Sequence, residues 1–131
     1  MKQGAPRARS VLRVLLAIVM ISAGIFHFVR PAGFVKIVPS FLPAAEFLVL
    51  LSGVFEILGG AGLLHARTRR LSSFGLMALF VAVFPANINM AWNDIQPEGG
   101  HIPAALLWLR LPLQLVLVIW AWWVGKPSSD E

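Results

Sequence analysis

Four long apolar segments dominate the pattern along the chain. They run from about 11 to 28, 44 to 64, 71 to 91 and 104 to 124, and each contains very few charged side chains. A helix rises about 1.5 Å per residue, so about 20 apolar residues cross the roughly 30 Å hydrocarbon core of a bilayer. The pattern therefore predicts an all-α integral membrane protein whose single domain, residues 1–131, is an antiparallel bundle of four transmembrane helices.

The connections between these segments differ in character. Residues 29–43 contain three prolines, yet they are too apolar for a solvated loop, so we expect an interfacial segment folded over one mouth of the bundle. Residues 92–103 are polar and acidic and predict an exposed loop. Residues 65–70 form a short basic connection.

The charge distribution predicts the orientation in the membrane. Of the 11 lysines and arginines, eight flank the first segment, fill the 65–70 connection or follow the last segment: Lys2, Arg7, Arg9, Arg13, Arg67, Arg69, Arg70 and Lys126. Basic residues favour the cytoplasmic side, so both termini are expected there. This placement also means that the net charge of +5 does not indicate nucleic-acid binding.

The composition narrows the class of protein. The chain is 58% hydrophobic and only 13% charged, which is typical of a membrane protein. It contains no cysteine, which excludes disulfides, thiol relays and cysteine-bound metals within the chain.

Glu56 lies near the middle of the second apolar segment, where an ionisable side chain is costly and usually functional or buried in the bundle. Ser52, Gly53, Gly59 and Gly60 share its helix face. Small residues allow helices to approach closely in lipid. Glu56 is therefore expected to point into the bundle.

The other intramembrane polar residues converge on the outer half of the bundle. We take the ligand-binding candidates to be His27, Glu56, Asn87, Arg110 and Gln114; no catalytic residue is indicated, and no spacing fits a metal site. A purely structural interpretation remains open. In it, Arg110 pairs with Glu56, or reaches Glu46, and Asn87 links helices.

Several motifs resemble a known family. They are Ala23–Phe28 followed by Pro31, Ile37–Pro39, Ser52–Gly60, Phe84–Ala91 and Arg110–Gln114. Their order is similar to that of the DoxX-like family of small four-span membrane proteins. The resemblance implies a left-handed bundle in the bacterial inner (plasma) membrane, associated with redox complexes. It supplies no catalytic residues.

Three functions are compatible with these features. The first is a subunit of, or accessory to, a membrane redox complex, which binds a small amphipathic or quinone-like ligand and is not an enzyme on its own. The alternative is a non-catalytic assembly protein with a structural polar core. A small oligomeric channel or transporter is the third. The expected partners are the lipid bilayer, a membrane or periplasmic redox protein and further copies of the chain; the only cofactor considered is a quinone, with none bound covalently.

Overall fold

The computed structural model describes residues 4–96 and 100–127. Its helices are α1 (Gly4–Val29), α2 (Pro31–Val35), α3 (Ala45–Leu63), α4 (Arg69–Trp92) and α5 (Ala104–Val124). The four long helices contain the four apolar segments to within a residue or so at each end, and α1 begins earlier than its segment. Lys2, and Glu98 of the acidic connection 92–103, lie outside the described residues.

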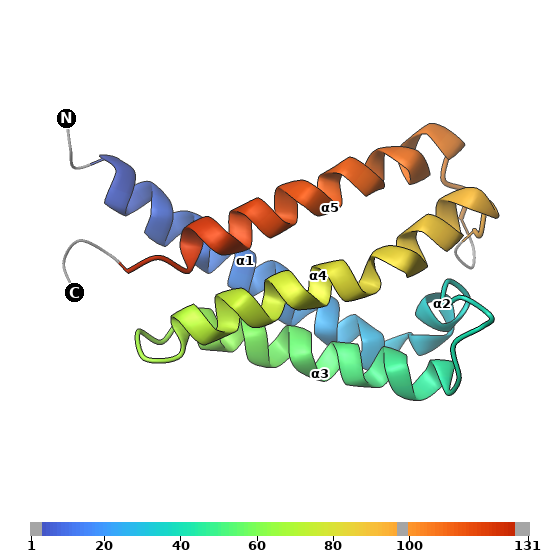
Figure 1. The fold of residues 1–131 in the computed structure, drawn as a ribbon, viewed down its shortest axis with the longest axis horizontal. Helices are drawn as coiled ribbons and strands as arrows, with labels where there is room; N and C mark the ends of the chain where they lie inside the picture. The colour runs from blue at the N-terminus through green and yellow to red at the C-terminus, as the bar shows by residue number, and fades with distance from the viewer. Residues whose placement is uncertain (1–3, 97–99, 128–131) are drawn as a thin grey trace.

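The long helices form an antiparallel bundle, as predicted (Figure 1). Helix α3 packs against α1 and α4, whereas α5 packs mainly against α4 and meets α1 over a shorter stretch. The start of α1, the end of α5 and the α3–α4 connection lie at one end, which we call the terminal end. Helix α2 and the α4–α5 connection lie at the opposite end, which we call the α2 end.

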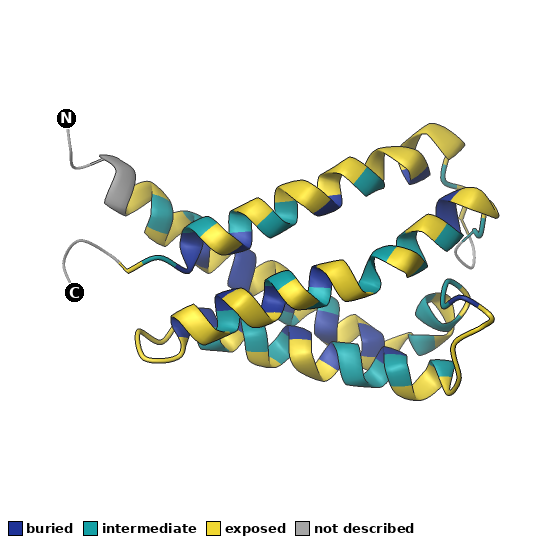
Figure 2. Cartoon of the chain, viewed as in Figure 1, coloured by how far each residue is buried: buried dark blue, intermediate teal, exposed yellow. Residues whose placement is uncertain are grey.

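The surface of the bundle is suited to lipid. All four long helices are long and apolar enough to span a membrane. Most of their outward positions are exposed, and many carry large apolar side chains (Figure 2). Because so much apolar surface would be unfavourable in water, the chain is a multi-pass membrane protein.

Helices α1 and α3 touch through their backbones. A Cβ atom added to Gly24 would lie 2.6 Å from the Gly53 carbonyl oxygen, and one added to Gly60 would lie 2.9 Å from the carbonyl oxygen of Ala17. Only glycine permits this approach, which matches the role expected for the small residues around Glu56. The crossing determines where the polar side chains of both helices meet.

Two buried arginines complete the terminal end. Arg13 Nε donates to the Val124 carbonyl at 2.8 Å, and Arg69 Nε donates to the Leu63 carbonyl at 3.1 Å. Both acceptors belong to the last residue of a helix, where carbonyls lack helical partners and the helix dipole favours a cation. The basic residues that predict orientation therefore also cap helices.

The segment 29–43 folds over the α2 end of α1 and α3. Pro31 occupies the first turn of α2, where a missing N–H is tolerated, so a short helix forms despite the prolines. The ring of Phe34 in α2 lies 3.9 Å from the His27 ring, centroid to centroid. Helix α2 therefore covers His27.

Candidate functional site

The five predicted ligand-binding residues divide into two groups. His27 and Glu56 meet between α1 and α3, whereas Asn87, Arg110 and Gln114 meet between α4 and α5. The possible Glu56–Arg110 and Glu46–Arg110 pairs are not formed. The reason is that α5 packs on α4 while α3 carries Glu56 toward α1, so the two charges belong to different helix pairs.

The first group is compact and buried. His27 Nε2 lies 3.2 Å from Glu56 Oε2, and His27 Nδ1 lies 2.9 Å from the Val49 carbonyl oxygen. Ser52 Oγ lies 3.0 Å from Nδ1 and donates to the same carbonyl at 3.2 Å. Nowhere in residues 4–96 and 100–127 do three His, Asp or Glu side chains gather as a metal site would require.

The second group is a chain of hydrogen bonds. Gln114 is buried, and its Nε2 donates to the Phe80 carbonyl at 3.0 Å. Asn87 Nδ2 donates to Gln114 Oε1 at 3.1 Å. Arg110 joins through a long 3.5 Å contact to Asn87 Oδ1 and a 2.9 Å contact to the sulfur of Met90. The network locks α5 onto α4.

Arg110 has an unusual environment in this network. It is exposed although it lies about 9 Å into α5, at about 1.5 Å per residue from Ala104. Both of its hydrogen-bond partners are neutral, and no carboxylate among the described residues forms an ion pair with it. A cation within a membrane span is costly without a counter-charge, so the guanidinium is suited to bind an anion or a strong acceptor.

An apolar groove of about 420 Å³ runs beside Gln114, between α4 and α5. Its lining residues are Phe80, Val81, Phe84, Leu111, Pro112, Gln114, Leu115 and Val118. Binding sites for small molecules commonly combine such an apolar wall with a few polar groups. Gln114 belongs to both the groove and the hydrogen-bond chain, so it joins the apolar space to Asn87 and Arg110.

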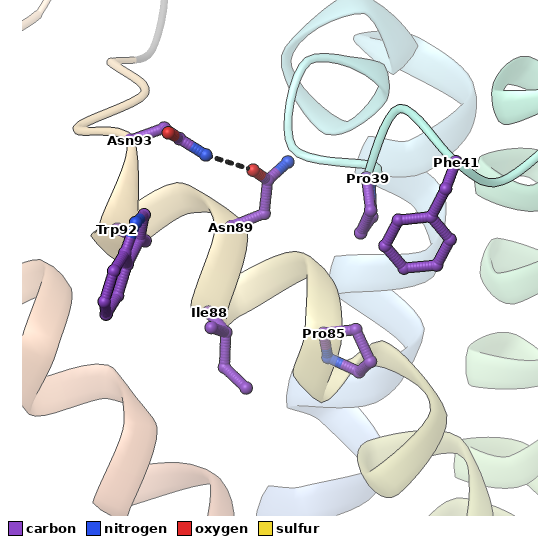
Figure 3. A pocket seen from close by; sticks show the side chains of 7 residues that line it. All are labelled: Pro39, Phe41, Pro85, Ile88, Asn89, Trp92 and Asn93. Atoms are coloured by element: carbon purple, nitrogen blue, oxygen red, sulfur yellow. Dashed lines mark hydrogen bonds between the residues drawn. The ribbon is translucent and has the colours of Figure 1, made fainter.

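A second groove, of about 290 Å³, lies at the α2 end between α4 and the α2–α3 connection (Figure 3). Pro39 and Phe41 face it from the connection, and Asn89, Trp92 and others face it from α4. None of these residues was among the sequence-based candidates. The apolar, proline-rich composition of 29–43 was the available signal, but it did not show which helix the segment would contact.

Asn89 fastens this connection to α4 by donating from Nδ2 to the Ile37 carbonyl at 2.9 Å. We expect Asn89→Leu to weaken the attachment by about 1 kcal/mol, the usual net value of one hydrogen bond. Hydrogen exchange of the amides in 37–43 should then accelerate. Asn93→Leu is the control, because the Asn93 side chain donates to Asn89 Oδ1, whereas it is Asn89 that donates to the Ile37 carbonyl. Equal exchange in both variants would contradict the assignment.

Comparison with protein families identifies the family of this chain. A family model described as a domain of unknown function, DUF8561, matches residues 16–125, so the chain belongs to that family. No curated protein and no solved structure matches it.

The resemblance to the DoxX-like family is therefore wrong. The structure shows why the motifs misled. Gly24 and Gly53 stand at a close helix crossing, and Gly59 faces Leu76 of α4. Small residues at such spacings serve any tightly packed membrane bundle, so they identify packing rather than a family.

Proposed function

We propose that this protein binds a small amphipathic, lipid-soluble molecule between α4 and α5. The apolar body of the ligand would occupy the groove beside Gln114, and its polar head would meet Arg110 and Asn87. The observation that supports this proposal is the exposed Arg110, which lies within a span and whose hydrogen-bond partners among the described residues are neutral.

The site defines the chemistry of the ligand head. Arg110 supplies only donors, so the head must carry an acceptor or a negative charge. A quinone carbonyl and a fatty-acid carboxylate both meet this requirement on an apolar body. Participation in a redox complex and a bacterial inner membrane were implied by the DoxX-like resemblance, and both lose that support.

We further propose that both termini face the cytoplasm. The terminal end contains Arg7, Arg9, Arg67 and Arg70, all exposed or half-buried, in addition to the two capping arginines. The α2 end, and with it the polar head of the site, would then face the outside. A ligand would enter the groove laterally from the outer half of the bilayer.

Replacing Arg110 with leucine tests the site. We expect at least a tenfold loss of affinity for an added ligand, since one charge-assisted hydrogen bond contributes about 1.5–3 kcal/mol and about 1.4 kcal/mol is tenfold. The measurement is titration of the purified protein in micelles with a short-chain quinone and, separately, with a medium-chain fatty acid. The probe that binds shows which kind of head group the site accepts.

Arg30→Leu is the matched control, because Arg30 is an exposed arginine at the same end of the bundle but outside the groove. Gln114→Leu should also weaken binding by removing the polar group of the groove. If neither probe binds the wild-type protein, or if both bind Arg110→Leu as tightly as wild type, the proposal fails. The structural alternative, a polar network that only fastens α5 to α4, would then be preferred.

A further inference from the structure

The His27–Glu56 pair is not used by the proposed site. Both residues are buried, with 6% and 9% of their surfaces exposed, and they lie on helices other than α4 and α5. Buried polar groups inside a membrane are costly and need either partners or a role. The contacts of the two imidazole nitrogens indicate what this role is.

The imidazole nitrogens have different partners. Nδ1 lies 2.9 Å from the Val49 carbonyl, which can only accept. Because the nearby Ser52 hydroxyl donates to that same carbonyl, we assign a hydrogen to Nδ1. Nε2 faces Glu56 Oε2 at 3.2 Å. Two bare lone pairs would repel at this separation, so one proton must lie on either the nitrogen or the oxygen. The pair is then imidazolium with carboxylate, or imidazole with carboxylic acid.

We propose that His27 and Glu56 form a proton-binding site in the membrane interior, which holds one proton between Nε2 and Oε2. Transfer moves the proton from the Glu56 carboxyl to Nε2 and leaves a carboxylate beside an imidazolium, so the total charge of the pair stays zero. A neutral pair is far less costly in lipid than a lone carboxylate.

Glu56 Oε2 is suited to such exchange. It is buried and accepts no aligned hydrogen bond from the described residues; its approach to Nε2 is a close contact without good hydrogen-bond alignment. An atom in this state can take up a proton or a donor without first breaking a bond. The Phe34 ring of α2 packs against the His27 ring at a tilt of 39°, with the ring centroids 3.9 Å apart.

Few other charges act on this pair. Helix α2 carries no charged residue, and Arg30 and Lys36, which flank it, are exposed. In α3, Glu46 is exposed and lies ten residues before Glu56. The described part of α4 is charged only at its start, at the terminal end, and Arg110 of α5 is bonded to α4. Whether the proton lies on Nε2 or on Oε2 therefore depends mainly on His27 and Glu56 themselves.

Nitrogen-15 NMR of histidine-labelled protein in bilayers tests the proposal. His65 and His101 are both exposed, so replacing them with glutamine leaves His27 as the only labelled histidine. Near neutral pH we expect nitrogen-15 NMR to show that Nδ1 is protonated. The second proton should lie either on Nε2, where NMR detects it, or on Glu56, where infrared spectroscopy detects the carboxylic acid. In Glu56→Gln the carboxyl is absent, so His27 should be a neutral imidazole that receives a hydrogen bond at Nε2, whichever form the wild-type pair takes.

Three results would overturn the proposal: a neutral imidazole beside an ionised Glu56, a His27 tautomer with bare Nδ1, or a His27 imidazolium that persists in Glu56→Gln. A separate experiment tests whether Phe34 shields His27. Phe34→Ala should accelerate deuterium exchange of the shared proton, whereas Phe41→Ala should not, because the structure records no ring contact between Phe41 and His27. Equal exchange in the two variants would exclude Phe34 as the barrier.

Discussion

Replacing Gly24 with alanine is expected to lower the free energy of unfolding by about 1–3 kcal/mol, the usual cost of overpacking a tight core. The new Cβ would lie 2.6 Å from the Gly53 carbonyl oxygen and 2.7 Å from a side-chain carbon of Ile57. The first neighbour is backbone and cannot rotate away, so α1 and α3 must separate. Reversible unfolding in mixed micelles measures the change.

Gly75→Ala provides the matched control. A Cβ at Gly75 in α4 meets nothing within 4 Å. The same substitution there should be neutral, or stabilising by up to about 1 kcal/mol, because alanine favours helix more than glycine does. If both variants have the stability of wild type, the close contact between α1 and α3 is contradicted.

His27→Leu is expected to be strongly destabilising, by about 3 kcal/mol or more, because removing one member of a buried pair leaves the other without its partner. Adding Glu56→Leu should recover more than half of that loss. Two leucines in the space of His27 and Glu56 leave neither a charge nor a polar group between α1 and α3. Wild type, His27→Leu, Glu56→Leu and the double variant form a double-mutant cycle measured by the same unfolding assay.

Additive losses in this cycle would mean that the two side chains act independently, against the 3.2 Å contact between them. A favourable coupling free energy between the two positions would agree with this contact. The result does not depend on any ligand, so it separates the packing of α1 and α3 from the proposal for α4 and α5.

The sequence predicted the bundle well because a bilayer restricts the possibilities. Backbone groups in lipid must be satisfied within a helix, so a run of about 20 apolar residues has essentially one structure. The bounds of α3 and α5 match their apolar segments to within a residue at each end. The small face around Glu56 correctly indicated a close helix contact, which proved to be with Gly24 of α1 and Leu76 of α4.

The partners of the polar residues were less predictable. Helical periodicity gives the face of Glu56 and of Arg110 but not which helix lies opposite. Opposite charges suggested a Glu56–Arg110 pair, whereas the packing order places Glu56 against His27 and Arg110 against Asn87. The groove at Pro39 and Asn89 also depends on long-range packing, which the residues near either position do not reveal.

The most direct test of the proposed function is mass spectrometry of the protein after gentle extraction from its own membrane. We predict one lipid-soluble molecule with an acceptor or acidic head per chain in wild type and in Arg30→Leu, and its loss in Arg110→Leu. A wild-type protein without such a molecule, or one that is retained equally by Arg110→Leu, would contradict a binding site between α4 and α5.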